Sequence, residues 1–105
     1  MAEIVWTEPA LSDLDAIADY IALDDPNAAA ELVRRVFEHV EQLKAYPQRD
    51  SKPLELRKSR YRQIVHPRCR IFYRYDGKRV LILHAMRSER LLRKRRLVAR
   101  VRKNP

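Results

Sequence analysis

Arginine is the residue type whose number and spacing suggest chemistry in this chain. Those that could form a site are Arg57, Arg60, Arg62, Arg70, Arg74, Arg87 and Arg90. A guanidinium group binds phosphate or carboxylate through two parallel hydrogen bonds. Because side chains alternate along a strand, we expect Arg70 and Arg74 to share one face of a sheet, with Arg62 joining them from the neighbouring strand. That face could hold an RNA or DNA backbone or an acidic peptide; alternatively, Arg70 pairs with a carboxylate of the helical hairpin.

Other residue types that perform catalysis are sparse. The three histidines, His39, His66 and His84, have no metal-ligand spacing with one another or with Cys69. We expect each histidine to be structural or solvated, and Cys69 to fill space at the start of a strand. Gly77 is the only glycine, which excludes a glycine-rich phosphate loop and a serine nucleophile elbow. The sequence therefore predicts no metal and no cofactor.

Charge is distributed unevenly along a chain of 105 residues. Residues 1–45 hold three basic and ten acidic residues, a net charge of −7, whereas residues 46–105 hold twenty basic and four acidic residues, a net charge of +16. Such asymmetry is typical of a surface that binds a polyanion or an acidic protein. The length supports one domain, 1–105. No stretch is typical of a secretory signal or a membrane span, so we expect a cytoplasmic protein.

Two amphipathic helices are predicted after a short strand. Residues 3–6 are rich in β-branched and aromatic side chains, which favours a strand. Thr7 and Asp25 stand where helix N-caps belong, each with a proline in the following turn. The second helix should end near Tyr46-Pro47, because proline disfavours helical geometry at the residue before it. Helices joined by so short a link form an antiparallel hairpin that must pack on another element, and a sheet is expected.

The apolar period changes from about 3.6 to 2 after a charged loop over residues 47–60. Three strands are expected beyond it, over residues 61–66, 69–75 and 79–85. Asp76-Gly77 predicts a tight hairpin between the last two strands. The final strand is nearly all apolar, so it should be central and covered on both faces. For the basic tail over residues 93–105, both a helix and a flexible segment that folds on a partner stay open.

Eight short stretches match one protein family in order and spacing. They are Trp6-Thr7, 10–14, 17–21, 26–29, Leu56-Arg57, Tyr61-Arg62, 70–73 and 80–87. Over about residues 3–92 the chain resembles the RelE/ParE superfamily, the toxins of bacterial type II toxin–antitoxin pairs. The resemblance implies an α+β fold of order β-α-α-β-β-β. A small, mainly antiparallel sheet of about four strands would be packed by an N-terminal helical hairpin, and the basic tail could form a C-terminal helix.

The family divides by target, and the residues favour one branch. Members that cut mRNA in the ribosome carry basic residues on the strand matching 61–65, an arginine matching Arg70, an arginine before the final Glu-Arg, and a tyrosine near the C-terminus. Arg62 and Arg70 match this pattern. The positions that depart from it are Ile64, Ser88 and Lys94. The chain therefore resembles the ParE-like, plasmid-stabilisation branch, whose members poison DNA gyrase.

The predicted function is a toxin that inhibits growth by binding DNA gyrase, without catalysis. The residues expected to bind the target or the antitoxin are Arg57, Arg62, Arg70, Arg74, Arg87 and Arg90. One alternative is a ribosome-dependent mRNA endoribonuclease that uses Arg62, Arg70 and His84. A second alternative is a non-catalytic basic module that binds nucleic acid.

The resemblance also implies partners. They are a ParD-like antitoxin and DNA gyrase, or, in the nuclease alternative, the ribosome and its mRNA. Promoter DNA would be reached only through the antitoxin, and no membrane is involved. A basic domain with a free strand edge near residues 61–66 also suits an acidic, partly disordered chain, which could lay an amphipathic helix beside the helical hairpin.

Overall fold

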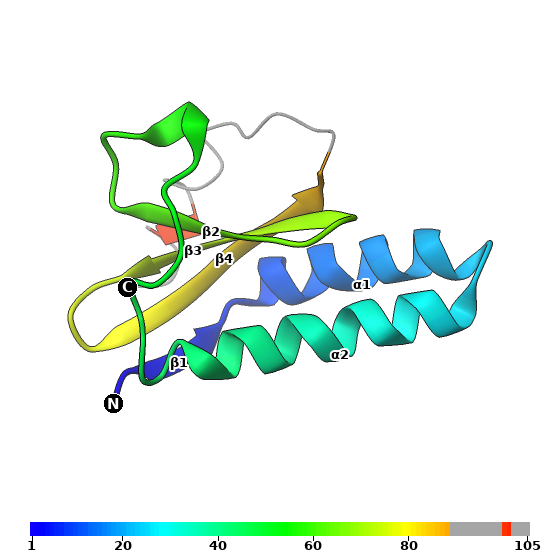
Figure 1. Cartoon of the computed structure of the whole chain (residues 1–105), viewed down its shortest axis with the longest axis horizontal. Helices are drawn as coiled ribbons and strands as arrows, with labels where there is room; N and C mark the ends of the chain where they lie inside the picture. Colours follow the sequence, from blue (N-terminus) through cyan, green and yellow to red (C-terminus); the bar gives the residue numbers. More distant parts are fainter. Residues whose placement is uncertain (89–99, 102–105) are drawn as a thin grey trace.

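The computed structural model describes residues 1–88 and 100–101, and in it two helices pack on one face of a four-stranded sheet (Figure 1). The elements are β1 (Glu3–Trp6), α1 (Glu8–Ala22), α2 (Pro26–Gln42), a 3₁₀ turn η1 (Leu54–Leu56), β2 (Tyr61–Val65), β3 (Cys69–Tyr75) and β4 (Arg79–Arg87). The strand order is β1-β4-β3-β2, with β1 parallel to β4 and the other pairs antiparallel. The predicted α+β fold and element order are confirmed.

Both predicted N-caps begin the helices where the sequence placed them. The Thr7 hydroxyl oxygen accepts a hydrogen bond from the Ala10 N–H at 3.3 Å, and the Asp25 carboxylate accepts one from the Ala28 N–H at 3.1 Å. Each bond satisfies one of the backbone donors that a helix leaves free in its first turn. The Thr7 hydroxyl also donates to the Ile82 carbonyl at 2.8 Å. The start of α1 is thereby tied to β4.

Some element ends differ from the predicted bounds. α2 ends before Tyr46-Pro47, because the Leu43 N–H bonds to the Val40 carbonyl three residues back and the chain leaves α-helical geometry there. The predicted charged loop contains η1. β2 is one residue shorter than expected, whereas β4 runs two residues further, since Cys69 still pairs with Arg87.

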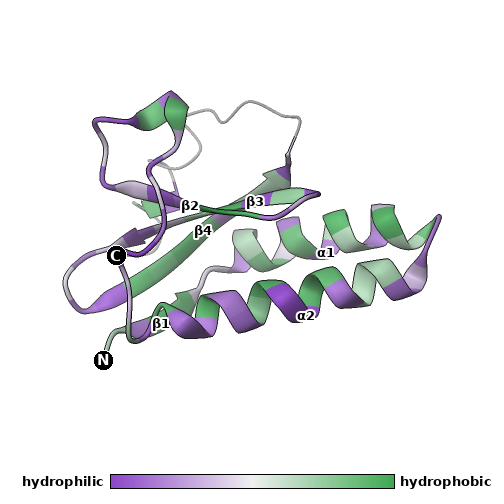
Figure 2. Cartoon of the chain, in the orientation of Figure 1, coloured by the Kyte–Doolittle hydropathy of each residue, from purple (hydrophilic) through white to green (hydrophobic). Residues whose placement is uncertain are grey.

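The sheet carries an apolar cluster on each face. The cluster between the helices and the sheet contains, among others, Leu14 and Ile17 of α1, Val36 and Val40 of α2, and the strand residues Ile64, Ile71, Tyr73, Val80 and Ile82. The opposite face holds Leu56, Tyr61, Phe72, Leu81, Leu83 and Met86, with Val101 of the tail packed against them. Figure 2 shows the resulting apolar character along β4, whose seven inner residues are all buried. The prediction that this strand is central and covered on both faces is confirmed.

A bulge in the β3–β4 ladder places two successive side chains on the same face of the sheet. Phe72 pairs with His84 and Tyr73 pairs with Ile82, so Leu83 is an extra residue on β4. A bulge bends its strand and changes the direction of neighbouring side chains. Leu83 and His84, the partner of Phe72, therefore both lie on the face away from the helices, where the His84 and Phe72 rings stack with centres 5.9 Å apart and His84 Nδ1 reaches Asp13 on α1. The bulge thus builds a polar link between the sheet and α1.

Candidate functional site

Arg70 lies on the sheet face away from the helices and is held by a carboxylate. Its guanidinium donates to the two oxygens of Glu55 at 2.9 and 2.7 Å and to the Gln63 side-chain oxygen at 3.0 Å. The guanidinium carbon also lies 4.9 Å from the centre of the Phe72 ring, which is cation–π distance. The expected alternative partner was a carboxylate of the helical hairpin. The partner found here is Glu55 of η1.

Arg62 lies on the opposite face of the sheet, so the prediction that it joins Arg70 and Arg74 is wrong. Arg62 is paired with Tyr73, whose side chain packs toward the helices, whereas Arg70 is paired with Val65. Paired residues on adjacent strands share a face, so the register determines on which face of the sheet each arginine lies. The Arg62 guanidinium donates to the Asp50 carbonyl at 2.7 Å. It braces the loop that precedes η1.

The remaining predicted arginines are spread over the molecule. Arg57 is exposed just after η1, and Arg74 lies half-buried near the end of β3. Arg87 ends β4, with its guanidinium carbon 4.7 Å from the centre of the Tyr20 ring on α1. Arg90 lies outside the described residues. The six arginines therefore do not form one face, and their contact with a target stays a prediction.

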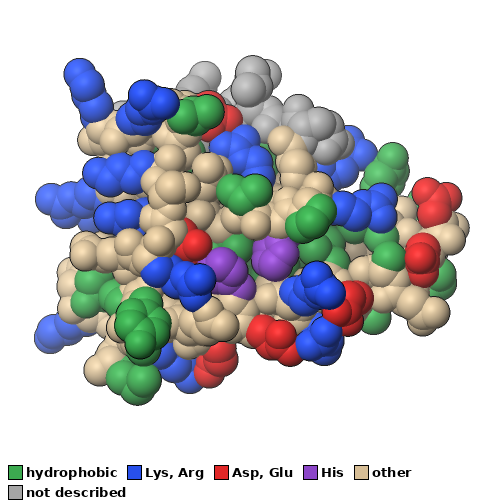
Figure 3. Space-filling view, viewed as in Figure 1, with side chains coloured by type: hydrophobic (Ala, Val, Ile, Leu, Met, Phe, Trp, Pro, Cys, Tyr) green, Lys and Arg blue, Asp and Glu red, His purple; other side chains and the backbone are tan. Residues whose placement is uncertain are grey.

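A second polar cluster joins α2, the loop after it and the β2–β3 pair. His39 Nε2 lies 3.1 Å from both carboxylate oxygens of Asp50, and the Tyr73 hydroxyl donates to the same carboxylate at 3.2 Å. The His39 and His66 rings meet edge to face, with centres 5.9 Å apart. Figure 3 shows two adjacent histidine side chains on this side of the molecule, with basic side chains around them.

Burial shifts the pKa values of two members of this cluster, His66 and Tyr73. The pKa of His66 is lowered by desolvation and by the nearby charges of His39 and Arg35. Burial, with the Asp50 charge beside it, raises the pKa of the Tyr73 phenol well above its ordinary value. His66 Nε2 is buried without a hydrogen-bond partner within the described part of the chain. A buried nitrogen does not reach a bound substrate, so the cluster's visible role is to tie α2 to the sheet.

A third cluster links α1, β4 and the tail. His84 Nδ1 lies 2.8 Å from the Asp13 carboxylate, and Arg100 donates to that carboxylate at 2.6 Å and to the Leu83 carbonyl at 2.8 Å. Burial alone would raise the pKa of Asp13, but hydrogen bonds from His84, Arg100 and the Ala85 N–H together hold it below its usual range. His84, the histidine proposed for the nuclease alternative, is thus buried inside a structural network.

No group in the described residues is arranged to hold a metal ion. Within residues 1–88 and 100–101, no three His, Cys, Asp or Glu side chains gather closely enough for one. Burial raises the pKa of the Cys69 thiol to about 11, so it stays protonated and a poor nucleophile. In the same ranges, no helix is both long and apolar enough to cross a bilayer.

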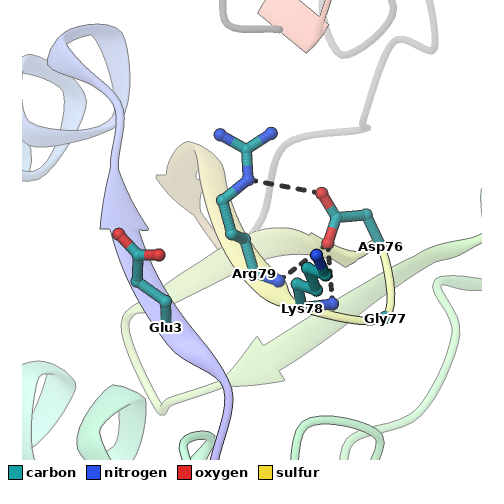
Figure 4. A pocket seen from close by; sticks show the side chains of 5 residues that line it. All are labelled: Glu3, Asp76, Gly77, Lys78 and Arg79. Atoms are coloured by element: carbon teal, nitrogen blue, oxygen red, sulfur yellow. Dashed lines mark hydrogen bonds and ion pairs between the residues drawn. The ribbon is translucent and has the colours of Figure 1, made fainter.

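A hollow of about 570 Å³ lies beside the β3–β4 hairpin (Figure 4). Its lining includes the turn residues Asp76 and Lys78, with Glu3 of β1 across from them. The Asp76 carboxylate accepts from the Lys78 and Arg79 N–H groups at 2.9 and 2.7 Å, and Gly77 supplies the positive φ that the turn needs. These polar groups satisfy one another and stabilise the hairpin, as Asp76-Gly77 predicted.

Comparison with known proteins identifies the family. Residues 4–92 match the family model described as "ParE toxin of type II toxin-antitoxin system, parDE". A solved structure of the chromosomal ParDE system from P. aeruginosa is similar with a TM-score of 0.68 and 30% identity, covering 85% of this chain and 98% of that one. The toxin–antitoxin complex RelBE2 from Mycobacterium tuberculosis, at 24% identity, shares the fold with a TM-score of 0.55, covering 82% of this chain and 96% of that one.

A curated relative matches over a shorter stretch. Toxin RelE2 of Caulobacter vibrioides is 45% identical over 49 residues, which are 47% of this chain and 56% of that protein. The match thus spans little more than half of the relative's length. The family model, by contrast, covers nearly the whole sheet and both helices. The chain therefore belongs to the ParE toxin family of the RelE/ParE superfamily and is a toxin of a type II toxin–antitoxin system.

Proposed function

We propose that this chain is a ParE-like toxin that stops growth by binding DNA gyrase in the cytoplasm, and that a cognate antitoxin neutralises it. The observation that carries the choice of target is the placement of Arg62 and Arg70. These are the two residues that match the nuclease pattern, yet they project from opposite faces of the sheet. Two cations so separated do not act on one phosphate.

The chemistry of RNA cleavage explains why this separation supports the proposal. Attack by a 2′-hydroxyl needs a group that takes its proton and cations that stabilise the negative charge of the phosphorane. Arg70 is bound to Glu55, and Arg62 is bound to the Asp50 carbonyl. His84, the proposed base, is buried against Asp13. Binding without catalysis fits these side chains better.

The antitoxin part of the proposal rests on two solved structures that are similar to this chain. The solved P. aeruginosa structure is titled as a ParDE system, and the M. tuberculosis structure as a toxin–antitoxin complex. By this likeness, the partner here is a ParD-like antitoxin that binds promoter DNA with its other end. The positive charge of residues 46–105 favours an acidic chain as that partner.

Two assays run side by side test the proposal. The purified toxin should block supercoiling by gyrase or trap cleaved DNA on it, and should leave ribosome-bound mRNA intact in a purified translation system. The Ile82→Asp variant, which puts a charge in the core, serves as the unfolded control and should be inert in both assays. Codon-specific mRNA cuts with no effect on gyrase would reject the proposal.

The second candidate is the ribosome-dependent endoribonuclease, and the name of the curated relative RelE2 favours it. It predicts that Arg62→Ala and Arg70→Ala each abolish mRNA cleavage without affecting gyrase. The same two substitutions would leave mRNA untouched under the gyrase proposal, because no cleavage occurs with or without them.

A further inference from the structure

Five cations gather at one end of the molecule, where the segment after η1 meets the β3–β4 hairpin. They are Arg57, Lys58, Arg60, Arg74 and Lys78, here called the basic end. Tyr61 pairs with Arg74, so the chain entering β2 lies beside the chain leaving β3. Figure 3 shows basic side chains crowded at this end, which in Figure 1 holds the β3–β4 turn and the start of β2, while acidic side chains lie along the helices.

Among residues 1–88 and 100–101, no carboxylate forms an ion pair with a side chain of the basic end. Between residues 46 and 88 the acidic residues are Asp50, Glu55 and Asp76. Asp50 binds His39 and Tyr73, Glu55 binds Arg70, and Asp76 binds Arg79. Within the described residues, the five cations of the basic end therefore have no ion-pair partner. Their mutual repulsion favours a ligand that brings many negative charges close together.

Several cations elsewhere in the described chain form ion pairs. Arg34 and Arg35 on α2 pair with Glu31, and Arg34 also pairs with Glu38. Arg100 pairs with Asp13. Within the described residues, none of the ion pairs involves a cation of the basic end.

We propose that the basic end binds the phosphate backbone of double-stranded DNA without reading its sequence. This inference rests on the proposed function and deepens it. Gyrase holds a DNA duplex, and a toxin that contacts both gyrase and this DNA would bind the complex more tightly than a toxin that contacts gyrase alone. Duplex DNA carries one negative charge per roughly 1.7 Å of helix axis. Five clustered cations can therefore contact several phosphates of one duplex at the same time. It departs from the expectation that the toxin reaches DNA only through its antitoxin.

The aromatic side chains near the basic end favour a duplex over a single strand. Proteins that bind single strands stack bases on exposed aromatic rings. Tyr61 is buried in the second apolar cluster, and the Tyr75 hydroxyl donates to the Gly77 carbonyl at 2.9 Å. An acidic protein partner would need apolar or aromatic anchors among the charges. The exposed large apolar side chain closest to it in sequence is Leu54 of η1, and one aliphatic side chain beside five cations favours backbone binding.

The experiment measures fluorescence anisotropy of the full toxin, without antitoxin or gyrase, on two labelled duplexes of unrelated sequence. Five phosphate contacts predict a slope of about −4.5 for log affinity against log salt, or about a 500-fold loss between about 50 and 200 mM salt. Arg57→Ala/Lys58→Ala should reduce the slope by about 2, leaving about a 40-fold loss over the same range. Arg60→Ala/Lys78→Ala should do the same.

The matched control is Arg34→Ala/Arg35→Ala, which removes the same charge from α2. It should leave affinity and slope as in the parent toxin. Equal losses in the control and the test pairs would refute the basic end as the site, as would absent binding or preference for a single strand, duplex RNA or an acidic peptide. Because no gyrase is present, failure here leaves the gyrase proposal standing. If the toxin binds duplex DNA but does not inhibit gyrase, only the gyrase proposal is rejected.

Discussion

Replacing Arg70 with alanine should destabilise the fold, because its guanidinium is built into the sheet. The side chain is 12% exposed, its partner Glu55 is 22% exposed, and hydrogen bonds to Gln63 and Glu55 and the Phe72 ring hold it. Breaking a buried pair costs about 3–5 kcal/mol, and partial exposure of this one lowers the expected cost to about 2–3 kcal/mol. For a domain of this size that is a drop in Tm of about 10–20 °C. Differential scanning calorimetry measures it.

Two further variants isolate the interaction with Glu55. Glu55→Ala and the double variant complete a thermodynamic cycle, and the pair should show a coupling of about 1–3 kcal/mol. Arg79→Ala is the control: its ion pair with Asp76 is longer, at 3.4 Å, and more exposed, so it should cost at most about 1 kcal/mol.

Growth inhibition by the same variants separates structure from target contact. If Arg70→Ala keeps nearly the parent Tm yet abolishes toxicity, the guanidinium acts on the target and the structural account of the ion pair is refuted. A large fall in Tm, with toxicity restored at low temperature, supports that account.

Three other perturbations test the polar and buried groups described above. Thr7→Ala should lower the free energy of unfolding by about 1–2 kcal/mol in urea titrations, because it removes both the N-cap and the bond to Ile82; an unchanged midpoint would contradict this. Cys69, buried with its pKa raised to about 11, should resist iodoacetamide in the native protein and react in urea, as mass spectrometry would report; rapid native labelling would refute its burial. Because the folded-state pKa of His66 is lowered, the unfolded chain binds the proton more readily, and stability should fall as pH drops below about 6.5, by at most about 1.4 kcal/mol per pH unit. His66→Gln should flatten that decline in urea midpoints measured across the range; an equally steep decline would contradict the assignment.

The sequence predicted the local features of the fold well, because local chemistry determines them. Thr7 and Asp25 cap helices through bonds to a residue three positions away, and Asp76-Gly77 closes a turn of the same size. The apolar run of β4 predicted a strand buried on both faces. Each of these signals lies within a short stretch of sequence, and the tertiary structure is consistent with the local preference.

The candidate site was less predictable, since it depends on strand register and on loops. Arg62 was expected beside Arg70, but a register that pairs it with Tyr73 sends it to the other face. The partners Glu55 and Asp50 come from an irregular segment that no periodic pattern describes. The bulge beside His84, whose side chain contacts Asp13, could not be predicted either. It changes the pairing register between β3 and β4, and the sequence of each strand alone looks regular.

The parallel pairing of β1 with β4 sets the order in which the chain can fold. Glu3 pairs with Arg79, and the Thr7 hydroxyl reaches the Ile82 carbonyl 75 positions along the chain. Contacts between such distant residues form slowly, because a long loop must close before they add any stability. During synthesis the first strand and both helices emerge with no β4 to receive them. A product terminated before Arg79 lacks the strand that joins β1 to the rest of the sheet, so this toxin reaches its native topology only after β4 has been translated.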